Sequence, residues 1–393
     1  MHTPEIRCLA HLLLLAIVYV SFVSLGLPDA VMGVIWPAMR EDLGQPLAAV
    51  GVLTITMTVC AALSAGFAGR IVARVGTGVV VAASCLMTAL ALVGFSVAPS
   101  FAWLVLLGIP LGAGGGAVDA SLNHFVAAHY SSRHMNWLHG FWGVGATTGP
   151  AVMGLALAGP GGWTRGVLTL GLAQLTLAAL LWATLPLWRR EHSHPTDAAA
   201  ADEPPVVFKP VARRALWLAP LCFLFYVAAE MGTGLWAASI LVHRGTSLAQ
   251  AGFWVSVYFG SITAGRFGVG LVSNRLGNRR LVGLGVTLAL VGAVLFALPG
   301  LPAALSLAGL VLMGLGCAPV FPSLMHEAAR RFPADVARTV IGRQMMAAYA
   351  GGSVIPAAFG LLATWVGLGA VMPVVVVLLI ALLWATRALD RLT

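Results

Sequence analysis

Apolar stretches long enough to cross a lipid bilayer follow one another along almost the whole chain of 393 residues. Hydrophobic residues make up 60% of the sequence and charged residues 9%, whereas a soluble globular protein carries about 25% charged residues. A protein core of this size cannot bury so much apolar surface, so lipid must solvate most of it. Because a segment in lipid has to satisfy its own backbone hydrogen bonds, these stretches predict transmembrane helices.

Hydropathy and helix-breaking residues divide the chain into two groups of six predicted spans. The first group covers residues 12–37, 47–69, 78–97, 101–127, 136–158 and 165–188. The second group covers residues 215–242, 250–273, 281–298, 302–328, 340–365 and 367–386. The polar, proline-containing stretch between the groups predicts a flexible linker. We therefore expect an all-α polytopic membrane protein with an N-terminal six-helix half (1–188), a cytoplasmic linker (189–214) and a C-terminal six-helix half (215–393).

Basic residues are distributed unevenly between the predicted loops. Loops on one side contain Arg70, Arg74, Arg133, Arg189, Arg190, Lys209, Arg213, Arg214, Arg275, Arg279, Arg280, Arg330 and Arg331. Loops on the other side contain Arg40, Arg165 and Arg244. The positive-inside rule places the first group of loops and both termini in the cytoplasm, and we expect a bacterial inner (plasma) membrane. Because the positive charge follows the loops, the formal net charge of +9 does not indicate a nucleic-acid-binding face.

The two groups of spans carry an internal sequence repeat. A shift of 201 residues aligns Asp29 with Glu230, and a shift of 206 residues aligns Pro150 with Pro356. The first shift also aligns two similar loops, Gly69 with Gly270, Arg74 with Arg275 and Gly76 with Gly277. Six helices per unit preserve orientation, so an axis along the membrane normal should relate the halves. Transporters with such repeats bind their substrates between the halves, near the bilayer midplane.

Four charged residues, Asp29, Asp119, Glu230 and Arg266, lie inside predicted spans. A charge at membrane depth costs roughly 2.5 to 3.5 kcal/mol, so such residues usually face a water-filled cavity or a partner and mark a transport pathway. Burial disfavours the charged form of a carboxyl group, which suits a proton carrier. We predict that the three acids take part in proton coupling, with Asp119 as the main proton site. The alternative for each acid is a structural hydrogen bond to another helix.

Two six-helix halves, a central linker and the loops after the second and eighth spans resemble the major facilitator superfamily. The second loop, Gly270-Leu-Val-Ser-Asn-Arg275-Leu-Gly277, is similar to the cytoplasmic signature of that superfamily. The first loop, Gly69-Arg-Ile-Val-Ala-Arg74-Val-Gly76, is more degenerate. The resemblance covers the whole chain and implies twelve helices in two pseudo-symmetric halves that transport by alternating access. It also implies that Arg74 and Arg275 take part in gating.

A narrower resemblance is to the fucose:proton symporter-like branch of that superfamily. It rests on Gly112-x-Gly114-x-Gly116-x-x-Asp119-x-x-x-Asn123 and on Asn136-Trp-Leu-His139-Gly-Phe-Trp142-Gly143-Val-Gly145. Proteins of that branch carry an acid on helix four, an asparagine four residues later and an acid on helix one. Asp119, Asn123 and Asp29 match these positions. The resemblance implies proton-coupled import of a sugar or another small polar solute.

Candidate solute contacts are polar or aromatic residues on the spans that carry these acids or on helices five and eleven: Asn123, His139, Trp142, Trp36, Tyr226, Gln344 and Tyr349. Asn123 shares a helix face with Asp119, and glycines continue that face, leaving room for a close neighbour or a ligand. Trp36 is either a ring platform for a sugar or an interfacial anchor. His139 either contacts a solute or relays a proton, or it is a packing histidine.

Arg266 departs from the repeat, because the corresponding residue of the first half is Ala65. Counted from the inner loops, Arg266 and Asp119 lie at similar depths, roughly 15 Å inside the cytoplasmic face. One hypothesis is a gating salt bridge between them that weakens when Asp119 is protonated. The alternative, which we favour, is that Arg266 pairs within its own half.

Sequence motifs of other functional classes are absent. The chain has no phosphate-binding Gly-x-x-x-x-Gly-Lys-Ser/Thr loop, no metal-ligand pair at helical spacing and no shared cysteine spacing, so we expect no enzyme activity, cofactor or metal. We predict a monomeric secondary transporter whose partners are a small polar solute, protons and the lipid bilayer. Our best prediction is proton-coupled symport of a sugar or related neutral compound. The alternatives are a proton-driven exporter of drugs or metabolites and a transporter-like sensor without net flux.

Overall fold

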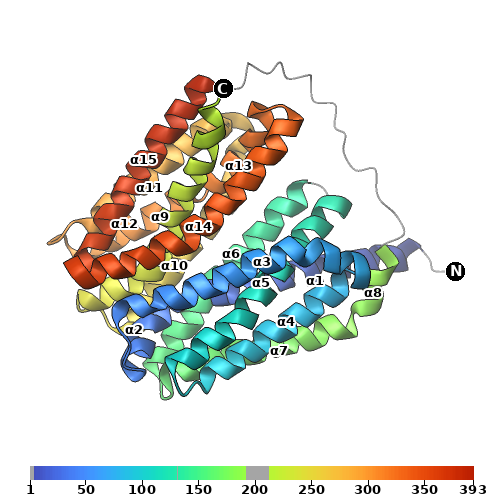
Figure 1. Ribbon diagram of the computed structural model, residues 1–393, viewed down its shortest axis with the longest axis horizontal. Coiled ribbons are helices and arrows are strands. Elements are labelled where there is room, and N and C mark those ends of the chain that lie inside the picture. Colours follow the sequence, from blue (N-terminus) through green and yellow to red (C-terminus); the bar gives the residue numbers. More distant parts are fainter. Residues whose placement is uncertain (1–3, 131, 192–211) are drawn as a thin grey trace. The chain divides into compact units, whose positions relative to one another are not determined.

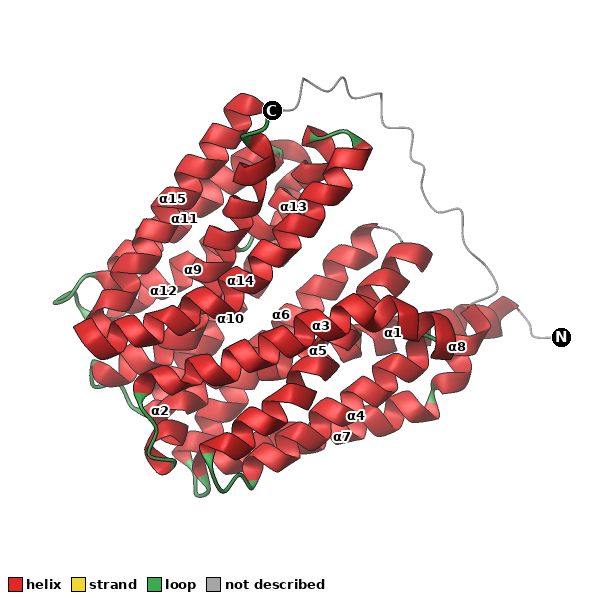
Figure 2. Cartoon of the chain, viewed as in Figure 1, coloured by secondary structure: helices red, strands yellow, loops and turns green. Residues whose placement is uncertain are grey.

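The computed structural model describes residues 4–130, 132–191 and 212–393, and these residues form helices joined by short loops, without β-strands (Figure 1, Figure 2). The first eight helices are α1 (Pro4–Asp29), α2 (Met32–Asp42), α3 (Val50–Val75), α4 (Thr77–Ser96), α5 (Phe101–His129), α6 (Ser132–Ala158), α7 (Gly162–Ala183) and α8 (Leu185–Glu191). The remaining α-helices are α9 (Ala215–His243), α10 (Leu248–Leu276), α11 (Asn278–Ala297), α12 (Ala303–Cys317), α13 (Val320–Arg331), α14 (Ala334–Val366) and α15 (Val371–Leu392). Short 3₁₀ turns, η1 (Leu47–Ala49) and η2 (Leu368–Ala370), precede α3 and α15.

The helices are long and apolar enough to cross a membrane. Counted over the described residues, eleven helical segments meet this condition. The remaining predicted span corresponds to α10, which is 29 residues long and includes side chains at 270–275 that lie outside the described part of the structure. The predicted all-α polytopic fold is therefore confirmed. Most of the predicted linker, 192–211, lies outside the described residues.

Three of the predicted spans are interrupted, and one of them, 165–188, is divided at Thr184 between α7 and α8. The first, 12–37, is divided because α1 ends at Asp29, directly after Pro28, and α2 begins at Met32. The span 302–328 is divided between α12 and α13, at Pro319, because proline has no backbone N–H to continue the helix. The first interruption matters for function, because it places Asp29 at a helix end inside a membrane-spanning segment.

The chain divides into two compact units, Met1–Gln45 with Val52–Ala201 and Pro46–Gly51 with Asp202–Thr393. In the first unit, α1 packs on α6, and α4 packs on both α5 and α7. In the second unit, α9 packs on α14 and α15, and α11 packs on α12 and α15. Figure 1 shows α4 and α7 of the first unit running side by side. Each unit is thus a helical bundle in its own right.

Close glycine contacts show the internal repeat in three dimensions. A Cβ atom on Gly145 of α6 would collide with the backbone of Val23 in α1. At positions shifted by 206 and 201 residues, a Cβ atom on Gly351 of α14 would collide with the backbone of Leu224 in α9. Small residues at such crossings let two helix backbones approach closely in lipid.

The fourth span of each unit packs on the second in an equivalent way. A Cβ atom on Gly112 of α5 would collide with the backbone of Met57 in α3. At positions shifted by 202 and 201 residues, a Cβ atom on Gly314 of α12 would likewise collide with the backbone of Tyr258 in α10. The repeat seen in the sequence is therefore a repeat of helix crossings.

The last glycine of each signature loop has a backbone conformation that favours glycine. Gly76 has φ 85° and Gly277 has φ 74°, and each immediately precedes the next helix, α4 or α11. Residues with a Cβ rarely adopt positive φ, so the loops need glycine there for the turn itself. This turn accounts for the glycine of the motif independently of any role in gating.

Candidate functional site

The first candidate site joins the end of α1 to α6. Trp142 donates a hydrogen bond from Nε1 to Oδ2 of Asp29 at 2.9 Å. The glycine crossings set this distance, because a Cβ atom on Gly26 would collide with the Trp142 carbonyl and one on Gly145 would collide with α1. Asp29 is exposed within the first unit, and Trp142 is half-buried. The result is an acid held by a neutral donor.

The second candidate site lies on α5. Asn123 donates from Nδ2 to Oδ1 of Asp119 at 2.9 Å, one helical turn away, and the same nitrogen contacts the Asp119 carbonyl oxygen at 2.9 Å. Both side chains are half-buried. The carboxylates of Asp119 and Asp29 also interact electrostatically.

The glycines beside Asp119 accommodate a helix. The sequence left open whether the space at Gly112 and Gly116 receives a neighbour or a ligand. Cβ atoms at these two positions would collide with the backbone of Met57 and Ala61, which both belong to α3. The space is therefore occupied by α3 itself.

The third candidate site belongs to the second unit and joins α9 to α10. Arg266 Nη2 lies 3.4 Å from Oε1 of Glu230, and the side chains are 14% and 2% exposed. The Tyr258 hydroxyl donates to the backbone carbonyl of Glu230 at 3.0 Å. In this structure Arg266 thus has a partner within its own unit, which is the arrangement that the sequence reasoning favoured over a bridge to Asp119.

Two aromatic candidates are packed inside the units. Trp36 is buried in α2, with its ring centroid 6.1 Å from that of Phe101. Tyr226 is buried in α9, and its hydroxyl donates to the carbonyl of Cys317 at 3.2 Å. Both rings therefore serve packing in the structure described.

The other predicted solute contacts are partly or fully buried. His139 is half-buried, with its ring edge-on to Phe22 at a centroid distance of 5.8 Å. Gln344 of α14 is buried, and its Oε1 atom has no hydrogen-bond partner among the described residues. Tyr349 is half-buried, and its carbonyl accepts a bond from Ser353 Oγ at 2.8 Å. Gln344 therefore carries a buried acceptor that no described residue satisfies.

The predicted gating arginines are not equally described. Arg74 is exposed at the end of α3. The side chain of Arg275 lies outside the described part of the structure, as does that of Asn136. Arg74 and Arg275 remain predictions.

A charged network at the ends of α11, α13 and α15 was not anticipated. Arg279 Nε lies 3.1 Å from Glu327 Oε2, and Arg331 Nε lies 3.4 Å from the same oxygen. Arg331 also pairs with Asp390 near the C-terminus. The four-residue spacing of Glu327 and Arg331 was a sequence signal for the contact within one helix. The pairing with Asp390 had no comparable signal.

Tyr258 was also missed as part of the Glu230 site. It precedes Arg266 by eight residues on α10, so the two side chains lie about two turns apart on neighbouring faces. That spacing from a charged residue was the available sequence signal. Within the described ranges, no group of three or more His, Cys, Asp or Glu residues is placed to hold a metal ion.

The helix count, the repeated bundle and the intramembrane acids together define a polytopic membrane transporter. The family model of the Major Facilitator Superfamily matches residues 17–356 and 223–391, and the chain belongs to this superfamily. It is 26% identical over 385 residues to an uncharacterized MFS-type transporter of Yersinia pestis, in an alignment that covers 94% of each chain.

Solved structures of the same fold are similar along almost the entire chain. A bacterial homolog to the human lysosomal transporter Spinster, in an inward-facing and occupied conformation, aligns with a TM-score of 0.78 and 13% identity over 98% of this chain and 97% of that one. A mutant of the nucleoside transporter NupG aligns with a TM-score of 0.74 and 12% identity over 95% of this chain and 98% of that one. At these identities the likeness establishes the fold and leaves the substrate open.

Proposed function

We propose that this superfamily member imports a small polar, uncharged solute by proton-coupled symport through alternating access. The observation that carries the proposal is the chemistry around the acids of the first unit. Asp29 is bound by an indole N–H and Asp119 by an amide N–H, each at 2.9 Å. Neither hydrogen bond comes from a cation.

Neutral donors suit an acid that must gain and lose a proton in each cycle. If Asp29 or Asp119 is protonated, no buried positive charge is left without a partner. Glu230 differs, because protonation there would remove the negative charge that lies 3.4 Å from the guanidinium of the buried Arg266, which is unfavourable. We therefore assign proton uptake to Asp119 with Asp29, and we propose that Glu230 contributes through its pairing with Arg266.

The class of solute follows from the groups available to hold it. Within the first unit, Asn123 and His139 offer hydrogen-bonding groups, and Trp142 offers an aromatic face. Sugars and related polyhydroxyl compounds are bound by such combinations of neutral polar groups on an apolar, aromatic wall. The resemblance of the Asp119–Asn123 and His139–Trp142 segments to fucose:proton symporters supports the same class. We also propose a bacterial inner membrane with both termini in the cytoplasm, on the basis of the loop charges.

Reconstitution tests the proposal directly. The purified protein is placed in proteoliposomes, and uptake of labelled sugars, polyols and nucleosides is measured with an inwardly directed proton gradient and without one. We expect accumulation of at least one such solute that requires the gradient and disappears in Asp119→Asn. Solute exchange without any dependence on protons in the wild type would reject proton coupling, and absence of uptake across the panel would reject this solute class.

Proton-driven export of cationic compounds is the second candidate. The observation in its favour is that Asp29 is exposed, so its carboxylate is available to attract a cation. Inside-out and right-side-out vesicles distinguish the two directions. Accumulation of lipophilic cations in inside-out vesicles, driven by a proton gradient, would support the exporter.

A further inference from the structure

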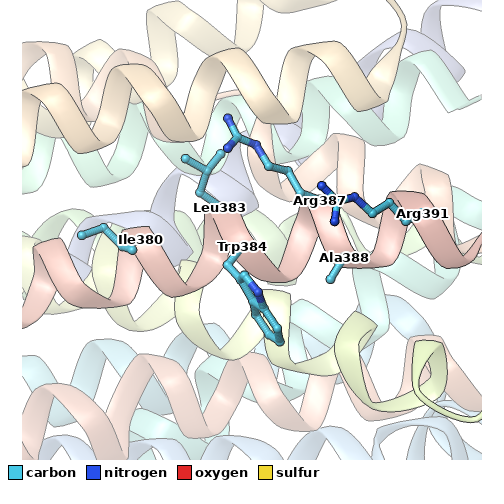
Figure 3. Close-up of a pocket in the computed structure, with 6 residues that line it drawn as sticks. All are labelled: Ile380, Leu383, Trp384, Arg387, Ala388 and Arg391. Atoms are coloured by element: carbon cyan, nitrogen blue, oxygen red, sulfur yellow. The ribbon is translucent and has the colours of Figure 1, made fainter.

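The exposed side of α15 carries a small hollow with a basic and aromatic lining near the C-terminal end of the helix. The hollow has a volume of about 290 Å³ and is lined by Ile380, Leu383, Trp384, Arg387, Ala388 and Arg391 (Figure 3). All six residues belong to α15, and their spacing of three, four and seven residues places them along one side of the helix. The hollow is therefore a feature of one helix surface near the C-terminal end of the chain.

The apolar part of this surface faces lipid. The membrane-spanning segment Leu368–Leu392 contains an 18-residue window with a mean hydropathy of 2.7. Val377, Ile380 and Trp384 are exposed along the same side of α15, and Trp384 is 65% exposed. Tryptophan is enriched where a spanning helix meets the lipid headgroups. The stripe thus runs from the apolar part of the bilayer to the interface at Trp384.

The two arginines one and two turns beyond this tryptophan carry uncompensated charge. Arg387 and Arg391 are exposed, and neither forms an ion pair or a side-chain hydrogen bond with any residue that the structure describes. The acid nearest in sequence, Asp390, is engaged by Arg331. Figure 3 shows Arg387 and Arg391 on successive turns beside Ala388. Two guanidinium groups are therefore available to an anion at the headgroup level.

We propose that this hollow binds an anionic phospholipid, with the phosphodiester held by Arg387 and Arg391 and an acyl chain lying along the Ile380–Trp384 stripe. Guanidinium groups match phosphate geometry with paired N–H donors. Basic surfaces at the ends of spanning helices attract anionic lipids in this way. A second copy of the chain is a poorer occupant, because a two-fold contact would bring the same two positive charges together. The proposal does not depend on which solute is transported.

Lipid titration of the full-length protein in a neutral detergent tests this site. Binding of phosphatidylglycerol is followed by native mass spectrometry for the wild type and for Arg387→Gln/Arg391→Gln. Each arginine near a membrane surface adds about fivefold in affinity for anionic lipid, so the double variant should bind roughly 25-fold more weakly. Each single variant should lose about fivefold. Arg387→Lys/Arg391→Lys should bind more tightly than the glutamine variant but more weakly than the wild type, because lysine retains the charge but lacks the paired N–H donors.

Matched controls separate this site from a general effect of charge. Arg70→Gln/Arg280→Gln removes two exposed arginines elsewhere and should leave binding unchanged. Phosphatidylcholine with the same acyl chains should bind weakly to the wild type, and glycerol phosphate should not compete at equal concentration. Equal binding of phosphatidylcholine, full competition by glycerol phosphate, or equal losses in the two double variants would each overturn the proposal.

Discussion

Arg266 lies 3.4 Å from Glu230 inside the second unit, whereas the position that corresponds to Arg266 in the first unit is occupied by Ala65. The acid that corresponds to Glu230 is Asp29, and it is bound by Trp142 from a different helix. Two acids at equivalent positions of the repeat therefore have different partners, one cationic and one neutral. This difference is the basis on which we propose proton exchange at Asp29 and ion pairing at Glu230.

Loss of one member of the Glu230–Arg266 pair should destabilise the protein more than loss of both members. Removal of one partner from a buried ion pair costs about 3–5 kcal/mol, because the other charge is left unpaired. We therefore expect Glu230→Gln and Arg266→Gln each to lower the melting temperature of the detergent-purified protein markedly. The double variant Glu230→Gln/Arg266→Gln should be more stable than either single variant. Additive losses in the double variant would contradict this interpretation.

The hydrogen bond between Trp142 and Asp29 should be visible as an energetic coupling. Trp142→Phe keeps an aromatic ring but removes the indole N–H, and Asp29→Ala removes the carboxylate oxygen that accepts the bond. A hydrogen bond to a charged group contributes about 1.5–3 kcal/mol. A double-mutant cycle on the free energy of unfolding should therefore give a coupling of at least about 0.5 kcal/mol. Full additivity of the two single changes would show that the hydrogen bond contributes nothing to the free energy of unfolding.

Asp119 should be required for proton-driven accumulation but not for solute exchange. In Asp119→Asn the side chain is permanently neutral, so it mimics the protonated state. We expect gradient-driven uptake to fall at least about tenfold, while counterflow of labelled against unlabelled solute persists. Uptake and counterflow in proteoliposomes measure the two activities separately.

Asp42 provides the control for this experiment. Its carboxylate also accepts a hydrogen bond from an indole, that of Trp163, at 2.6 Å, but it lies at the end of α2. Asp42→Asn should leave gradient-driven uptake within about twofold of the wild type. Equal loss of accumulation in both variants would contradict a specific role of Asp119 in proton coupling.

The glycine crossing between α1 and α6 should tolerate no side chain. Gly145→Ala would place a methyl group against the backbone of Val23, which cannot move aside as a flexible side chain does. Overpacking of this kind destabilises by about 1–3 kcal/mol. Gly283→Ala is the matched control, because no atom lies within 4 Å of the added Cβ. Melting temperatures should fall for the first variant and change little for the second.

Much of the architecture could be predicted from local properties of the sequence. Hydropathy located the spans, and the shifts of 201 and 206 residues matched the helix crossings at Gly145 and Gly351. Local features could also be misread: Pro319 divides a span that hydropathy shows as continuous. Asn123 and Asp119 could be paired in advance, because residues four apart share a helix face.

The partners of Asp29 and Glu230 could not be predicted from local properties of the sequence. Asp29 and Trp142 are 113 residues apart, and Arg266 and Glu230 are 36 apart on different helices. Whether two such side chains meet depends on how each helix is rotated and how closely its neighbour approaches, which Gly26 and Gly145 control for α1 and α6. Hydropathy and spacing describe one segment at a time, so they identify the membrane fold and the charged positions. The choice between a neutral partner for Asp29 and a cationic partner for Glu230 arises from packing between helices.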